Sequence, residues 1–222
     1  MMKFTRAKIF LFCFLFLLVP FLKAEAQPSA SDYSCMVLID PGHGGDDTGV
    51  KVSRKEVEKN ITLAIALALK KELESNGITV CLTRGEDVSL SIEERIAMVE
   101  QLKPRVLLSL HVNGGFGRSA SGYEISFPAK QNTAGQDKGK IQHVNHSIRL
   151  AQVMQNNLEE VFPRKGRGVR EAPVPLLSVL HAPSVCIELA FLTNEADRKV
   201  ISGKKQKAVV QALTRGVQEY LK

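Results

Sequence analysis

The sequence contains no tryptophan, three tyrosines and four cysteines among 222 residues. Its lysines and arginines do not form runs interleaved with aromatic residues, so a net charge of +7 does not indicate a nucleic-acid-binding surface. No segment repeats along the chain, which excludes a repeat architecture. These absences favour one globular domain that does not bind nucleic acid.

The four cysteines form neither a disulfide framework nor a metal-binding pattern. They are far apart in the sequence, and no Cys-x-x-Cys pair occurs. Cys35, Cys81 and Cys186 each lie in or beside an apolar, strand-like run, where a thiol packs as a small hydrophobic group. We therefore expect buried free thiols, with a Cys35–Cys81 bridge after export as the alternative.

The apolar run near the N-terminus is shorter than the roughly 20 residues that a membrane-spanning helix needs. Residues 1–8 are basic, residues 9–19 are apolar, and residues 24–26 read Ala-Glu-Ala, a small-x-small cleavage pattern. This order predicts a signal peptide over residues 1–26 and no stable membrane insertion after its removal. Cleavage removes four bases and one acid, which lowers the net charge from +7 to +4.

Apolar runs of strand length alternate with helical patterns along the rest of the chain. Strands are expected at residues 36–40, 78–83, 106–112, 123–127 and 185–189. Helices are expected at residues 58–74, 91–102, 145–161 and 204–221, with a further short helix capped by Thr193. Residues 128–144 are predicted to be a loop, and an irregular segment is expected to extend to Pro175.

This alternation predicts an α/β fold with a mostly parallel sheet and helices on both faces. We expect one domain over residues 36–222, preceded by a short polar linker over residues 27–35. The 196 residues that remain after signal removal are enough for one domain with a substantial core.

Side chains that bind metals follow the ends of three predicted strands. His43 follows the first strand, His111 lies at the end of the third, and Glu188 lies near the end of the last. Glu58 begins the first helix directly after a glycine-rich loop. Because sites in parallel α/β sheets gather at the carboxyl ends of strands, we expect these residues to meet. Two imidazoles and a carboxylate are a common ligand set for catalytic zinc, and a further glutamate can transfer protons.

Five blocks of the sequence resemble the zinc-dependent N-acetylmuramoyl-L-alanine amidases. The first two read VLIDPGHGGDDTG at residues 37–49 and EKNITL at residues 58–63. The third contains Thr83, Arg84, Asp87, Leu90 and Arg95. The last two read SLHVN at residues 109–113 and PSVCIELAFLTN at residues 183–194. The blocks occur in order and cover nearly all of the chain after the signal peptide.

This resemblance implies one zinc ion per chain, bound by His43, Glu58 and His111, with Glu188 as general base and acid. Glu56 is a neighbouring alternative, but only Glu58 keeps the Glu-Lys…Leu pattern of the family. The implied reaction is hydrolysis of the amide bond between N-acetylmuramic acid and L-alanine in peptidoglycan. The expected location is the periplasm or cell envelope.

The other polar residues near these blocks have simpler explanations. We expect turn hydrogen bonds at Asp40 and Asp47 and internal ion pairs at Arg84 and Arg95. Metal binding is not expected of the remaining histidines, which are His143, His146 and His181.

Two alternative functions use the same residues. One is a zinc peptidase or another amidohydrolase, and the other is an inactive module that only binds the cell wall. All four chemical positions are filled, which argues against an inactive module. Residues 128–144 lack the apolar stripe of a helix that would cover the zinc site. We therefore expect a monomer with an open groove, acting on peptidoglycan without an obligatory activator.

Overall fold

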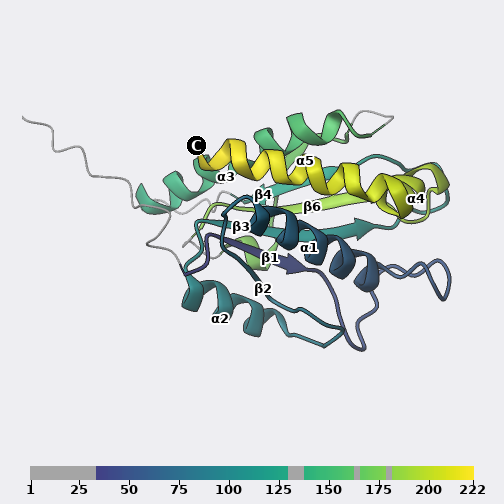
Figure 1. Cartoon of the computed structure of the whole chain (residues 1–222), viewed down its shortest axis with the longest axis horizontal. Coiled ribbons are helices and arrows are strands. Elements are labelled where there is room, and N and C mark those ends of the chain that lie inside the picture. The colour runs from purple at the N-terminus through teal and green to yellow at the C-terminus, as the bar shows by residue number, and fades with distance from the viewer. Residues whose placement is uncertain (1–33, 130–137, 163–165, 179–181) are drawn as a thin grey trace, which may run out of the picture.

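A six-stranded sheet organises the residues that the computed structural model describes, which are 34–129, 138–162, 166–178 and 182–222 (Figure 1). The predicted signal peptide, most of the linker and His181 lie outside these ranges. The strand order is β2-β1-β3-β6-β4-β5. The strands are β1 (Val37–Pro41), β2 (Val80–Leu82), β3 (Val106–Asn113), β4 (Glu124–Pro128), β5 (Val169–Ala172) and β6 (Ser184–Phe191).

The directions of the strands divide the sheet into two parts. Strands β2, β1, β3 and β6 are parallel, whereas β4 is antiparallel to β6, and β5 is parallel to β4. The mostly parallel sheet predicted from the sequence is therefore confirmed. Because of these directions, β4 and β5 begin at the edge of the sheet where β1, β3 and β6 end.

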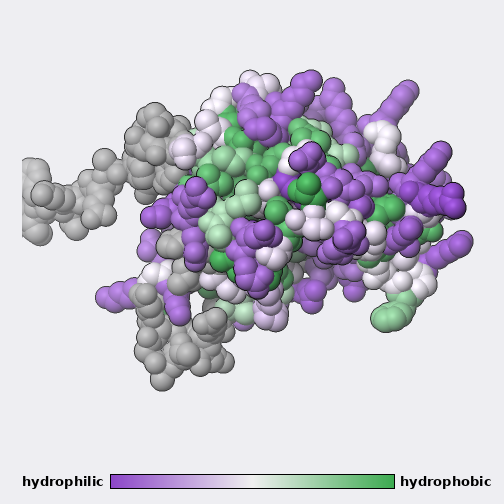
Figure 2. Space-filling view, turned by 90° about the horizontal axis from the view of Figure 1, so that it is seen from below, coloured by the Kyte–Doolittle hydropathy of each residue, from purple (hydrophilic) through white to green (hydrophobic). Residues whose placement is uncertain are grey.

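Helices cover both faces of the sheet, but unequally (Figure 1). One face packs beneath α1 (Glu58–Ser75), α3 (Lys138–Glu159) and α5 (Gly203–Leu221), while α2 (Ile92–Leu102) lies on the other side. The short elements are η2 (Pro175–Ser178) and α4 (Glu195–Ile201). Seen from the side of α2, hydrophobic residues lie near the middle of the molecule, and hydrophilic residues surround them (Figure 2).

The two faces differ in polarity because side chains alternate along each strand. The face beneath α1, α3 and α5 is apolar along the strands and contributes the larger core cluster. On the other face, Leu38 and Leu107 pack in a smaller cluster with residues of α2 and η2. Further along the same strands this face carries Asp40, Ser109 and His111. The polar half of this face is where the site forms.

The largest differences from the predicted elements concern α3, β5 and α4. Helix α3 begins at Lys138, seven residues before the expected start, because Val144 and the preceding His143 are buried in its first turns. Strand β5 lies within the segment predicted to be irregular, since its sequence VREA lacks an apolar alternation. The short helix α4 is capped by Asn194, whose side chain accepts from the amide of Asp197, and not by Thr193.

Cys35 and Cys81 are joined by a disulfide, so the prediction of free thiols is wrong for this pair and the alternative is correct. The parallel pairing of β1 with β2 places Leu38 opposite Cys81, which brings the start of β1 near β2. A bridge across 46 residues removes loop-closure entropy worth about 4 kcal/mol from the unfolded chain. Cys186 is free and buried as predicted, and burial raises the pKa of its thiol.

None of the helices in the described part of the chain is sufficiently long and apolar to span a bilayer.

Candidate metal and catalytic site

His43 is directed into the site by an uncommon backbone conformation. It lies just after β1 with φ of 61°, a region that few non-glycine residues occupy. Its Nδ1 is 2.8 Å from Oδ2 of Asp47, while Oδ1 of the same carboxylate accepts from the amide of Gly49. The turn hydrogen bond expected of Asp47 is therefore present. The contact with the imidazole is an additional role that the sequence did not indicate.

Glu58 is held by backbone amides on both sides. It is the first residue of α1, is only 3 % exposed, and lies where the helix dipole favours a negative charge. Its Oε2 accepts from the amide of Val50 at 2.8 Å, and its Oε1 accepts from the amide of Val112 at 2.9 Å. The carboxylate is therefore fixed by segments that precede α1 and that lie at the end of β3.

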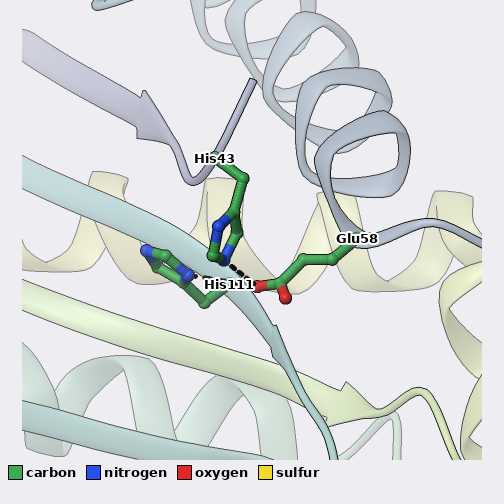
Figure 3. Close-up of side chains that lie close together, drawn as sticks. All are labelled: His43, Glu58 and His111. Atoms are coloured by element: carbon green, nitrogen blue, oxygen red, sulfur yellow. Dashed lines mark hydrogen bonds and ion pairs between the residues drawn. The ribbon is translucent and has the colours of Figure 1, made fainter. Parts of the chain in front are cut away.

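The two imidazoles converge on one oxygen of this carboxylate (Figure 3). Nε2 of His43 lies 3.0 Å from Oε1 of Glu58, and Nδ1 of His111 lies 3.1 Å from the same atom. The imidazole rings are 4.9 Å apart and nearly perpendicular. His43, Glu58 and His111 each offer a ligand atom, and these atoms all lie within 4.8 Å of one another.

This arrangement fits a zinc ion. Ligands about 2.0–2.1 Å from a tetrahedral ion lie roughly 3.3 Å from each other, close to the separations of the imidazole nitrogens from the Glu58 oxygen. Two glycines leave the room that these side chains need. A Cβ on Gly42 would lie 2.3 Å from Cε1 of His111, and one on Gly49 would lie 2.5 Å from Oε2 of Glu58. Gly49 also has φ of +59°, which disfavours any larger residue.

The contacts between His43 and Glu58 shift the pKa of each group toward its charged form. The hydrogen bond to Glu58, partly opposed by burial, raises the pKa of His43 to about 9. Burial alone would raise the pKa of Glu58, but the hydrogen bonds from His111, His43 and two backbone amides lower it to about 2. The carboxylate is thus ionised at neutral pH and stabilises an added positive charge, which is what binding of a cation requires.

Glu188 lies on the strand next to His111. The register of β3 with β6 places His111 and Glu188 opposite each other. Burial raises the pKa of Glu188 to about 7, assisted by the negative charges of Glu58 and Glu124 and opposed by His111. Its Oε2 is buried and has no hydrogen-bond partner among the described residues. A carboxylate of this kind can both accept and donate a proton near neutral pH.

Asp40 supports the site through the interior of the sheet and not through a turn, so that expectation is wrong. Its Oδ1 accepts from Oγ1 of Thr83 at 2.7 Å and pairs with Arg95, and its Oδ2 accepts from Oγ of Ser109 at 2.8 Å. The internal ion pair expected of Arg95 is confirmed. The guanidinium also donates to the carbonyl oxygen of His43 at 2.9 Å, so Arg95 links Asp40 to the loop after β1.

Arg84 and Glu56 have other roles than those considered from the sequence. Arg84 donates to the carbonyl oxygens of Pro41 and Gly42, and no carboxylate of the described residues lies within ion-pairing distance of it. The ion pair expected of Arg84 is therefore absent from this part of the chain. Glu56, the rival of Glu58, pairs with Arg198 at 3.0 Å and is not part of the cluster.

A cleft of about 220 Å³ adjoins the imidazoles of His43 and His111. Part of its wall is apolar. Leu90 and Ile92 at the start of α2 and Val174 and Leu176 around η2 form this part. The side chains of His43 and His111 are 23 % and 25 % exposed, so solvent reaches both rings. A substrate can therefore approach the cluster through the part of the molecule that the structure describes.

Comparisons with known proteins agree with this geometry. Residues 37–219 match the family model described as N-acetylmuramoyl-L-alanine amidase. The uncharacterised protein YqiI of Bacillus subtilis (strain 168) is 33 % identical over 185 residues, which are 83 % of this chain and 84 % of that protein. The amidase AmiC of Escherichia coli O6:H1 is 25 % identical, and the match covers 91 % of this chain but only 57 % of AmiC.

The fold is shared with solved amidases as well. The crystal structure of an N-acetylmuramoyl-L-alanine amidase from Clostridium difficile 630 superposes with a TM-score of 0.73 at 29 % identity. The similarity covers 84 % of this chain and 96 % of that one.

Proposed function

This chain belongs to the N-acetylmuramoyl-L-alanine amidase family, and from this premise we propose that it hydrolyses, with zinc, the amide bond between N-acetylmuramic acid and L-alanine in peptidoglycan. The observation that carries the proposal is the convergence of His43, Glu58 and His111 on one point, with Glu188 on the adjacent strand. Family membership makes the chain an enzyme of peptidoglycan amide hydrolysis. The proposal adds the ion, the bond and the roles of the residues.

One zinc ion per chain fits the ligand set, with Nε2 of His43, Nδ1 of His111 and a carboxylate oxygen of Glu58 as ligands. When bound, zinc supplies Lewis-acid polarisation of the substrate carbonyl and lowers the pKa of water. Three protein ligands leave a further position for water or substrate, as in other catalytic zinc sites.

Glu188 supplies the proton transfers. Its carboxylate accepts a proton from the attacking water molecule as the oxygen bonds to the carbonyl carbon. It then delivers the proton to the nitrogen of L-alanine as the C–N bond breaks, so that the peptide leaves as an amine. A group with a pKa near 7 is suited to both transfers.

The products of the purified protein test this reaction. Residues 27–222, loaded with zinc and incubated with peptidoglycan alone, should release peptides with a new amino terminus at L-alanine and leave a free lactyl carboxylate on the glycan. We expect this without any added partner, because the cleft is open in the described part of the chain. New amino termini elsewhere in the peptide would indicate a peptidase. Binding to the cell wall without any new termini would indicate an inactive module. Activity only after addition of envelope extract would contradict the expected independence from an activator.

The contact of Asp47 with His43 predicts a role in metal affinity. A carboxylate on the second imidazole nitrogen fixes the tautomer and orientation of a zinc-binding histidine, and its loss typically costs about 10–100-fold in affinity. Asp47→Asn should therefore weaken zinc binding by about that factor in competition with a chelating dye. Asp46→Asn is a matched control, because the neighbouring Asp46 carboxylate makes no hydrogen bond or ion pair with this imidazole, and the backbone amide of Asp46 donates to Oγ of Ser89. Equal zinc affinities of the two variants would contradict the role of Asp47.

A further inference from the structure

Glu124 lies beside Glu188, although no motif of the sequence singled it out. It begins β4 directly opposite Glu188 on the antiparallel strand β6. Directly opposed side chains project from the same face of a sheet, with Cβ atoms about 4.5–5.5 Å apart. The Glu124 side chain is only 10 % exposed. Two acidic groups are therefore neighbours at the edge of the site that is farther from the metal cluster.

Two arginines from the segment at the start of β5 cover Glu124. Nη2 of Arg170 lies 2.6 Å from Oε1 of Glu124, and Nε of Arg167 lies 3.6 Å from Oε2. The guanidinium of Arg167 also lies over the ring of Phe191, 5.2 Å from its centroid. The side chains of Arg167 and Arg170 are 49 % and 62 % exposed. Both therefore reach solvent next to Glu188.

The charges of this group do not balance. Glu124 contributes one negative charge and the two arginines contribute two positive charges, and among the described residues Glu188 forms no ion pair with either arginine. Glu171 lies between Arg170 and the end of β5, but it pairs with Phe127 and so projects from the opposite face. Each guanidinium has five N–H donors, and the ion pairs of the described residues use only one nitrogen of each. The group is suited to bind an anion at the surface, with Glu124 orienting the arginines from below.

The order of the strands relates this group to the reaction. The sheet runs β3, β6, β4, β5, so that His111, Glu188, Glu124 and the arginines follow one another across it. Because Glu188 transfers the proton to the leaving nitrogen, the peptide half of the substrate begins at β6 and can continue over β4. Both guanidiniums lie within 3.6 Å of the Glu124 carboxylate, which is one strand spacing, about 4.8 Å, from β6. A group bound by the arginines therefore lies roughly one to two bonded residues from that nitrogen.

We propose that Arg167 and Arg170, held by Glu124, form a carboxylate-binding subsite for the peptide half of the substrate. The proposal rests on the proposed function, which supplies a substrate with a peptide on the leaving side. In peptidoglycan the residue after L-alanine is commonly a γ-linked D-glutamate, whose α-carboxyl group is either ionised or amidated. The ionised form supplies a carboxylate on the residue next to L-alanine.

Two disaccharide tetrapeptides that differ only in this α-carboxylate or α-amide test the subsite. We expect the wild type to hydrolyse the carboxylate form with a kcat/KM about 10–100-fold higher, as typical of a charge-assisted hydrogen bond. Arg170→Met and Arg167→Met should lose most of this preference, mainly through a higher KM for the carboxylate form. Arg215→Met removes the same charge from α5, where Arg215 pairs with Glu160, and should keep the wild-type preference. Zinc content and thermal unfolding show whether each variant is folded.

Calorimetry measures the binding of the two released peptides to the protein. This measurement tests the subsite independently of the proposed reaction. Tighter binding of the carboxylate peptide, lost in Arg170→Met, supports the subsite even if the wild type cuts neither tetrapeptide. In that case the proposed reaction is wrong and the subsite stands. Cleavage at L-alanine with equal rates and equal binding for both forms overturns the subsite and leaves the reaction intact.

Discussion

Replacement of His43, Glu58 or His111 by alanine is expected to remove most of the bound zinc and to abolish hydrolysis of peptidoglycan. Each variant loses one of three protein ligands, and the structure places no fourth metal-binding side chain within reach among the described residues. A chelator should have the same effect on the wild type, and added zinc should restore activity. Metal content by mass spectrometry and dye release from labelled peptidoglycan measure the two effects.

Glu56→Ala is the matched control for Glu58→Ala. It removes an identical side chain two residues away, which pairs with Arg198 outside the cluster. This variant should retain one zinc ion per chain and near-normal turnover. Loss of zinc in Glu56→Ala with retention in Glu58→Ala would show that the ligand was assigned incorrectly.

The affinity for zinc should also depend on pH in a defined direction. The pKa of His43 is about 9 in the metal-free protein, so at neutral pH this imidazole must release a proton before it binds the ion. Glu58, with a pKa of about 2, is already ionised. Zinc binding should therefore strengthen about tenfold per pH unit up to about pH 9 and release a proton in a weakly buffered solution. Binding that weakens as the pH rises from 6 to 8 contradicts this mechanism.

Glu188→Gln is expected to lower kcat by about 10²–10⁴-fold while zinc content stays at one per chain. Glutamine keeps the shape of the side chain but cannot accept the proton of the attacking water molecule. Oε2 of Glu188 is buried and has no hydrogen-bond partner among the described residues, so an amide at this position should not break the fold. Steady-state kinetics on a soluble muropeptide and metal analysis of the same preparation test both parts of the prediction.

The pH profile distinguishes a proton-transfer role of Glu188 from a structural one. Burial raises its pKa to about 7, and a cation bound nearby lowers it, so the wild-type rate should fall as the pH decreases below about 7. The Glu188→Gln variant should lack this acidic limb. Glu195→Gln, in an exposed ion pair of α4 with Lys199, should keep both the rate and the limb. An unchanged profile in Glu188→Gln would show that another group transfers the proton.

The sequence by itself located the three residues that converge in the structure, because their positions depend on local structure. His43 and His111 follow or end apolar runs of strand length, and Glu58 begins a helix that is amphipathic over its whole length. Carboxyl ends of parallel strands meet at one edge, so these local features were enough to predict that the side chains converge. The capping box of Ser91 and Glu94 at the start of α2 is a local feature of the same kind, since both partners lie within one turn.

Tertiary structure alone decided the features that depend on pairing between distant segments. Nothing in the spacing of Cys35 and Cys81 reveals that β1 and β2 are neighbours, and the disulfide follows from that pairing. The reversed direction of β4 brings Glu124 beside Glu188, 64 residues later in the chain. Strand direction and register are set by how whole elements pack, and one residue of slip would turn Glu124 to the opposite face. The group formed by Glu124, Arg167 and Arg170 beside Glu188 could therefore be recognised only in the folded chain.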